Sequence, residues 1–284
     1  MTRLYVQHRT RYQYEIPVQV SYNEARMTPQ TDAQQVVLET ALSVRPQGAS
    51  VATYRDYWGT KVHTFDLHAA HEELTVAAEA LVEVHRLEKQ HAPEELLDWH
   101  ELSGAETFEE FSDFLPQSAL SEPGEELALA AAGIARGRTP HDAAHALFAW
   151  LREEMEYQPG HSQVSWDART AFHARKGVCQ DLSHVGIGAL RSLGLPARYV
   201  SGYIHPDPEA AAGTPVAGQS HAWLEWWDGR WHSWDPTNHQ PAGDHHIFVA
   251  RGRDYADVPP FKGILSGGGG QTTLDVEVTI TRQA

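Results

Sequence analysis

The hydrophobic pattern of this sequence changes its period near residue 105, and the change restricts the chain to a mixed architecture. Between residues 4 and 84, apolar and polar residues alternate in short runs such as 4–8 and 37–44, which is typical of β-strands. From residue 107 to residue 157, apolar residues recur at the spacing of one helix face. We therefore expect an α+β protein in which an N-terminal all-β domain precedes a core with helices and strands.

Helix signals are clear at two places. Thr139 precedes Pro140, which suits the first helical position, and apolar residues follow at helical spacing. A further helix is expected to begin near Val178, because the apolar residues that follow share one face, and to end at Gly194 before Pro196. Two or three helices fit within the segment before it.

Strands are expected again after that helix. Residues 198–204 form one strand, and residues 220–227 and 230–235 form a hairpin closed around the Asp-Gly pair between them. A last alternating run, 274–280, predicts a C-terminal strand that the sequence assigns to no particular sheet.

These signals divide the chain into three parts. We expect residues 1–90 to form the N-terminal β domain, residues 91–158 the linker and helical segment, and residues 159–284 the rest of the core. The polar stretch 85–105 has no sustained period and is interpreted as the linker. The Pro- and Ala-rich loop 205–218 lies between two core strands, where we expect it to shape access to a site.

Charge and composition exclude several classes of partner. The 284 residues include 22 Lys and Arg against 38 Asp and Glu, which gives a formal net charge of −16. This balance disfavours nucleic acids and anionic membranes, because both bind clustered basic residues. The sequence contains no run of 18 apolar residues and begins without the apolar stretch of a signal peptide, so we expect a cytoplasmic protein. The oligomeric state is left open.

Cys179 is the one cysteine of the sequence. It can form neither an intramolecular disulfide nor a cysteine-rich zinc site, so it is either a small buried group or a reactive thiol. A thiol attacks as its thiolate, which the exposed N–H groups of a helix N-terminus stabilise. Cys179 stands where the helix near Val178 begins, and Gly177 permits a close backbone approach there. The same N–H groups would stabilise an oxyanion during attack on an acyl group.

A reactive thiol also needs a base within hydrogen-bond reach, held in turn by a third group. If the hairpin loop consists of residues 227–229, then Trp226 pairs with Arg230. Counting back along both strands then places His221 directly opposite Asp235, with Cβ atoms about 4.5–5.5 Å apart. A two-residue loop would put these side chains on opposite faces. A Cys-His-Asp triad therefore predicts a three-residue turn.

Four segments, in order, carry a resemblance to a known family. They are G-V-C-Q-D-L-S-H from Gly177, G-L-P-A-R-Y-V-S-G-Y from Gly194, H-A-W from His221 and D-P-T from Asp235. They resemble the bacterial transglutaminase-like family. The N-terminal L-Y-V-Q-H-R-T-R-Y-Q-Y looks like the β domain that often precedes the core in that family. The resemblance covers nearly the whole chain.

The resemblance implies a papain-like core, in which a cysteine helix packs on an antiparallel sheet, and a triad of Cys179, His221 and Asp235. It implies attack on a peptide or carboxamide bond of a peptide or protein substrate through a thioester, without a cofactor. Resolution by water makes a cysteine peptidase or amidase and resolution by an amine makes a transglutaminase; we favour hydrolysis. The alternative is an inactive scaffold that binds a partner protein.

The residues that are candidates for the oxyanion site or the cleft are Gln180, Tyr157, Trp166 and Trp223. Helix capping is the simpler role for Gln180, and core packing is the simpler role for the aromatic residues.

Metal signals in the sequence are weak. His141 and His145 have the spacing of two ligands on a helix, but a solvated helix face explains them more simply. Adjacent His245 and His246 would point to opposite faces of a strand. The acidic residues form no cluster that resembles a calcium loop, so we expect neither a metal site nor activation by calcium.

Overall fold

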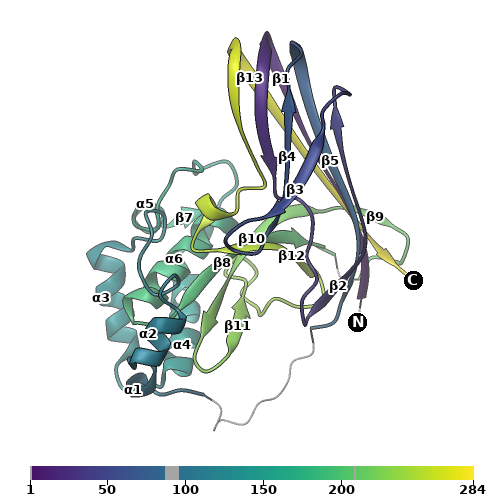
Figure 1. Cartoon of the computed structure of the whole chain (residues 1–284). Coiled ribbons are helices and arrows are strands. Elements are labelled where there is room, and N and C mark those ends of the chain that lie inside the picture. Colours follow the sequence, from purple (N-terminus) through teal and green to yellow (C-terminus); the bar gives the residue numbers. More distant parts are fainter. Residues whose placement is uncertain (1, 87–95, 208) are drawn as a thin grey trace.

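The computed structural model describes residues 2–86, 96–207 and 209–284. A long, curled antiparallel sheet forms one part of the molecule, and helices packed on a smaller antiparallel sheet form the other (Figure 1). The α+β class and the N-terminal β region expected from the sequence are confirmed.

The larger sheet has seven strands. Its main path is β2 (Gln35–Arg45), β5 (His71–Val84), β1 (Thr2–Ala25), β13 (Phe261–Gln283) and β9 (Pro215–Ala217); β4 (Lys61–Leu67) joins β1 to β3 (Val51–Arg55). Along β1, buried Leu4, Val6 and His8 alternate with more exposed residues. One side of this strand therefore faces the core, as its two-residue period predicts.

The C-terminal strand belongs to this sheet. β13 pairs antiparallel with β1 along most of its length, so the predicted core range 159–284 includes a strand that bonds to the N-terminal sheet. The short strand β9, inside the predicted loop 205–218, pairs with β13 in turn. Part of that loop is thereby anchored to the sheet; residue 208 lies outside the described residues.

Helices precede and cover the second sheet. They are α1 (Trp99–Leu102), α2 (Ala105–Glu110), α3 (Gly124–Ala135), α4 (Pro140–Glu154) and α5 (Ala168–Ala174). The Thr139 hydroxyl accepts the N–H of Asp142 at 3.2 Å, and Pro140 occupies the first turn, so α4 begins as predicted. Within the predicted linker 85–105, residues 87–95 lie outside the described residues, and α1 forms near its end.

The second sheet has the order β11 (Trp231–Trp234), β10 (Gln219–Trp227), β8 (Ala197–Ile204) and β12 (His246–Gly252). Helix α6 (Cys179–Ser192) packs on β8 and β10 and contacts α3, α4 and α5 on its other sides. A Cβ at Gly186 of α6 would lie 2.5 Å from Leu224 Cδ2, so any larger residue there would displace the Leu224 side chain. The predicted cysteine helix and the strand after it are both present.

Two shorter elements flank α6. A parallel pair, β6 (Glu156–Tyr157) and β7 (Lys176–Gly177), leads into its N-terminus, and the 3-10 helix η2 (Tyr255–Asp257) follows β12. Among the described residues, no helix is long and apolar enough to cross a membrane.

A continuous core joins the two sheets. One buried cluster contains Leu4 and Val82 of the first sheet together with Ile247 of the second. Side-chain amide bonds reinforce this contact: Gln35 donates to the Phe248 carbonyl at 2.8 Å and accepts the Phe248 N–H at 3.0 Å. The N-terminal sheet is therefore fixed against the strands that carry the candidate site.

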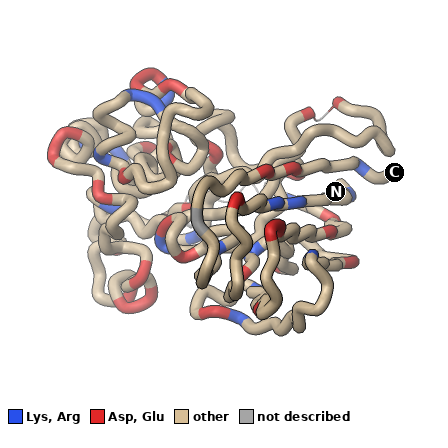
Figure 2. Tube along the Cα trace, turned by 90° about the horizontal axis from the view of Figure 1, so that it is seen from above, with Lys and Arg blue, Asp and Glu red and all other residues tan. Residues whose placement is uncertain are grey.

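Charged residues lie over both parts of the molecule, with acidic positions spread along helices and strands and basic positions among them (Figure 2). One ion cluster is centred on the buried side chain of Glu225, and its partners are partly exposed. Glu225 of β10 accepts hydrogen bonds from Arg198 at 2.7 Å and from Arg251 at 2.9 Å, and Arg251 also donates to Asp32 at 3.0 Å. This cluster ties β8, β10 and β12 to the segment before β2.

Candidate active site

Cys179 is the first residue of α6, and its side chain is partly exposed. The helix start is fixed by Asp181, whose carboxylate accepts the backbone N–H of Val178 at 2.8 Å. A Cβ at Gly177 would lie 2.6 Å from Asp181 Cβ, so this cap requires glycine just before the thiol. The thiol therefore stands beside the free N–H groups of a helix N-terminus, where negative charge is stabilised.

His221 of β10 connects Cys179 to Asp235. Its Nε2–H donates to Asp235 Oδ2 at 2.8 Å, and the ring lies close enough to the cysteine side chain for the sulfur to raise its pKa. Burial lowers the pKa of His221, but the hydrogen bonds and negative charges of its two partners together raise that pKa to about 9. The ring can therefore carry a positive charge at neutral pH, between the cysteine sulfur and a carboxylate.

Asp235 is fully buried and is held by several donors. Besides His221, its Oδ2 accepts from His246 at 2.9 Å and from the Asn238 side chain at 2.7 Å. Its Oδ1 accepts the backbone N–H groups of Thr237 at 3.0 Å and Asn238 at 3.1 Å. Burial alone would raise the pKa of Asp235, but these bonds and the nearby charge hold it well below its usual range. The carboxylate is thus ionised and fixed in orientation.

The hairpin that brings His221 and Asp235 together differs in register from the prediction. Trp227 pairs with Trp231, so the three-residue loop is 228–230 rather than 227–229. If this register is continued by one residue, Asp235 lies opposite Trp223. Trp223 is two positions from His221 and lies on the same side of the strand. The pair is diagonal rather than directly opposed. A shift of two residues preserves the face, so the predicted contact survives the wrong register.

His246 is a member of the site that the sequence did not assign to it. Its side chain is buried, Nε2 contacts Asp235, and Nδ1 accepts the Gly243 N–H at 3.1 Å. Because Nδ1 accepts a hydrogen bond, the proton of the neutral ring must lie on Nε2 and point at Asp235. In the sequence, His245 and His246 gave only a weak metal signal. The contact of His246 with Asp235 could not be predicted, because no local pattern shows that β12 lies near the end of β11.

Of the remaining candidates, Gln180 differs from the role expected for it, and Trp223 has the core-packing role that was the simpler one. Gln180 does not cap α6; its side-chain amide donates to the Val164 carbonyl at 3.0 Å, and Asp181 provides the cap. Trp223 is 0% exposed, with its ring centroid 6.2 Å from that of His221, so it packs behind the histidine and does not line a cleft. The strand alternation that brings Trp223 to the side of His221 also buries it.

Tyr157 and Trp166 lie nearer the surface. Tyr157 of β6 pairs with Gly177 and is 41% exposed. Its pKa is raised by burial and then by the negative charges of Cys179 and Asp235, so Tyr157 lies near the site. Trp166 is half-buried, packs against the main core and contacts the ring of His161.

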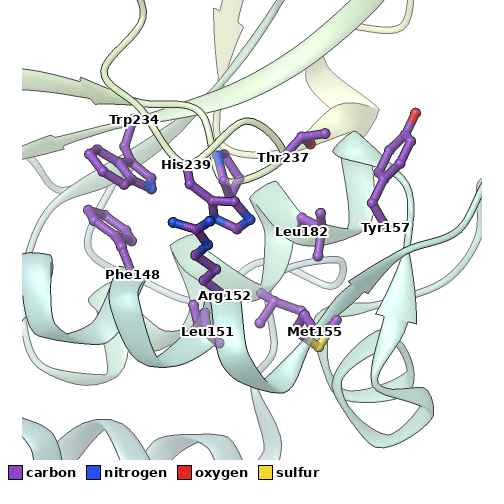
Figure 3. Close-up of a pocket in the computed structure, with 11 residues that line it drawn as sticks. Phe148, Leu151, Arg152, Met155, Tyr157, Leu182, Trp234, Thr237 and His239 are labelled. Carbon is purple, nitrogen blue, oxygen red and sulfur yellow. The ribbon is translucent and has the colours of Figure 1, made fainter.

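A small cavity of about 30 Å³ lies beside the site, between α4, α6 and the segment after β11. In Figure 3, the rings of Phe148 and Trp234 face each other at one end and Tyr157 stands at the other, with its hydroxyl directed outward. Leu182, one turn after Cys179, forms part of its wall. The cavity has room for about one water molecule or a methyl group.

The fold and site together define an α+β protein with a cysteine at a helix N-terminus next to a buried His–Asp pair. Residues 4–83 match the bacterial transglutaminase-like N-terminal region, and residues 128–236 match the transglutaminase-like superfamily. An uncharacterized protein of Mycobacterium leprae is 42% identical over 284 residues, covering 100% of both chains. The chain belongs to the transglutaminase-like superfamily and carries the N-terminal region of its bacterial members.

Two other relatives bear names that point to different reactions. The crystal structure of a candidate cysteine protease from Cytophaga hutchinsonii aligns with a TM-score of 0.74 at 18% identity, covering 99% of this chain and 98% of that one. A protein-glutamine gamma-glutamyltransferase of Pseudomonas aeruginosa is 31% identical over 111 residues, 35% of this chain and 17% of that protein. The first likeness shows the fold alone.

Proposed function

We propose that the protein is a thiol enzyme that cleaves a peptide or carboxamide bond, with Cys179 as nucleophile, His221 as acid and base and Asp235 as the residue that orients the histidine. The observation that carries this proposal is the position of His221, which bonds to Asp235 at 2.8 Å and lies beside the cysteine at the N-terminus of α6. A structural histidine would need no thiol partner at a helix end.

In the proposed reaction, the thiolate attacks the acyl carbon and forms a C–S bond, while the carbonyl oxygen gains a negative charge. In this proposal the backbone N–H groups at the start of α6 stabilise that charge. The imidazolium of His221 then gives its proton to the leaving nitrogen, the C–N bond breaks, and a thioester remains. Asp235 stays ionised throughout and stabilises the imidazolium.

The fate of the thioester sets the reaction class. If water attacks, His221 accepts a water proton, and the products are a carboxylic acid and the regenerated thiol. If an amine attacks, a new amide forms. We favour hydrolysis because Cys179 is partly exposed, so water can reach the acyl group. The proposed substrate is a peptide or protein. A fluorescent primary amine offered with a glutamine-containing peptide separates the two outcomes by mass spectrometry.

The activated thiol can be tested without a substrate, because the sequence holds one cysteine and each alkylated molecule is modified at a known position. Iodoacetamide alkylation is measured from pH 5 to pH 9 for the wild type, His221→Ala and His239→Ala. His239 is a matched control, since it lies by the cavity without bonding to the thiol. We expect fast alkylation at pH 6 in the wild type and in His239→Ala, and slow alkylation in His221→Ala. Equal rates in all three, or reaction only after unfolding, would favour an inactive scaffold.

A further inference from the structure

A second cluster of histidines joins α4 to the β10–β11 hairpin. His141 and His145 stand on successive turns of α4, Asp228 begins the hairpin loop, and His232 follows in β11. The sequence favoured a solvated face for this helix. His145 is exposed, whereas the His141 ring lies 5.5 Å from that of Trp226 and 5.0 Å from that of His232, so His141 packs against the hairpin.

Asp228 is the centre of the cluster, and its carboxylate is 0% exposed. Oδ2 contacts His141 Nδ1 at 2.9 Å, and Oδ1 contacts His232 Nε2 at 2.6 Å. One nitrogen of each histidine and one oxygen of the aspartate all lie within 4.8 Å of one another. Zinc–nitrogen and zinc–oxygen bonds of about 2.0–2.2 Å place neighbouring ligand atoms roughly 3.3 Å apart. Small movements of these side chains would therefore enclose an ion.

We propose that His141, Asp228 and His232 bind one divalent transition-metal ion of the zinc type. Imidazole and carboxylate ligands suit zinc, whereas calcium and magnesium prefer sites made of oxygen. His145 lies beside this group, with its ring 4.6 Å from that of His141, but it is not one of the three proposed ligands. Each ring supplies a lone pair to the ion when its proton lies on the nitrogen that faces away from Asp228.

The surroundings of the cluster provide a path for the ion and one opposing charge. An open cavity of about 880 Å³ is lined by His145, His232 and Trp226, so an ion can enter from solvent. The guanidinium of Arg230 lies close by, with Nε 3.4 Å from His232 Nε2. This positive charge weakens metal binding, and its removal should strengthen it.

The proposed ion takes no part in the thiol chemistry. It would cross-link α4 to the hairpin whose strand β10 carries His221 and whose end precedes Asp235. Because the ion binds the folded protein, it raises the unfolding temperature as its concentration increases. The role proposed for it is therefore to stabilise the hairpin, and it stands independently of the reaction at Cys179.

Zinc binding is measured by calorimetry on the full chain carrying Cys179→Ala, since a thiolate next to His221 is itself a potential zinc ligand. We expect one ion per chain and a rise in the unfolding temperature. Adding His141→Gln or His232→Gln should weaken binding by about 100-fold or more, as loss of a ligand exceeds the usual 10–100-fold effect of an outer partner. Adding Arg230→Gln should strengthen binding severalfold.

His221→Gln in the same background is the matched control, because His221, Asp235 and His246 form another group with metal-ligand spacing. It should leave zinc binding unchanged. The proposal is overturned if the Cys179→Ala protein shows no saturable zinc binding. It is also overturned if His141→Gln and His232→Gln still bind zinc while His221→Gln does not. If a variant does not fold without metal, histidine NMR of the Cys179→Ala protein decides: zinc must shift the signals of His141 and His232, and shifts confined to His221 and His246 refute the site.

Discussion

Replacing Glu225 by glutamine is expected to destabilise the protein strongly at neutral pH and much less in acid. Its buried carboxylate accepts from Arg198 at 2.7 Å and from Arg251 at 2.9 Å. Burial alone would raise its pKa, but the two guanidinium charges and their hydrogen bonds lower it to about 2. Glutamine preserves the size of the side chain and removes its charge, so Arg198 loses the carboxylate that compensates its burial and Arg251 keeps Asp32 but loses Glu225.

The magnitude follows from the pKa of Glu225 in the two states. The ordinary value is 4.5, and the folded value is about 2. A difference of about 2.5 pKa units corresponds to roughly 3.4 kcal/mol. Because the folded pKa is depressed, this stability is present above pH 4.5 and is lost as the pH falls toward 2, with about 2 kcal/mol gone at pH 3. Breaking a buried ion pair typically costs about 3–5 kcal/mol, which agrees.

Urea unfolding followed by tryptophan fluorescence at pH 7 and pH 3 tests this reasoning. The wild type should exceed Glu225→Gln in free energy of unfolding by about 3 kcal/mol at pH 7 and by about 1 kcal/mol at pH 3. Glu153→Gln, on the exposed side of α4, is the control and should change neither value. A difference between wild type and Glu225→Gln that is equal at both pH values would refute the role assigned to the ion cluster.

Three further changes test the site and its support. His246→Asn should slow cysteine alkylation at pH 6 by about 10-fold and His246→Gln less, because only glutamine can reach Asp235 with a donor as Nε2 does; equal effects would contradict this positioning role. In Asp235→Ala, the His221 ring should titrate clearly below its pKa of about 9 when followed by NMR, since the carboxylate charge that raises it is gone. Gly202→Ala should lower the free energy of unfolding by about 1–3 kcal/mol, because the new Cβ would lie 2.1 Å from the Ile247 carbonyl oxygen; unchanged urea unfolding would show that the strands can separate there.

Local signals in the sequence were sufficient to place the cysteine helix and α4. Thr139 and Pro140 mark one helix start through hydrogen bonding and a fixed backbone angle, which act within a single turn. The start at Cys179 is likewise set by Asp181 two residues later and by the space that Gly177 leaves for it. Features of this kind can be predicted because the interacting atoms are close in sequence.

The hairpin could be predicted only in part from the sequence. Its three-residue loop length and the shared face of His221 and Asp235 were predicted, because a two-residue period fixes the face once the loop length is known. The register was wrong by two residues. In the structure Trp227 remains in the strand opposite Trp231, and Asp228 turns inward to contact His141 of a distant helix. The sequence of the loop alone does not contain that contact.

The sequence by itself determined the α+β class, the order of the two parts and the helix start that carries the thiol. Only the tertiary structure decided that β13 closes on β1, that His246 supports Asp235 and that His141 meets Asp228 and His232. Each of these contacts joins strands or helices far apart along the chain. Their partners are chosen by packing and burial of the whole molecule, whereas periodicity and capping report only on neighbours within a few residues.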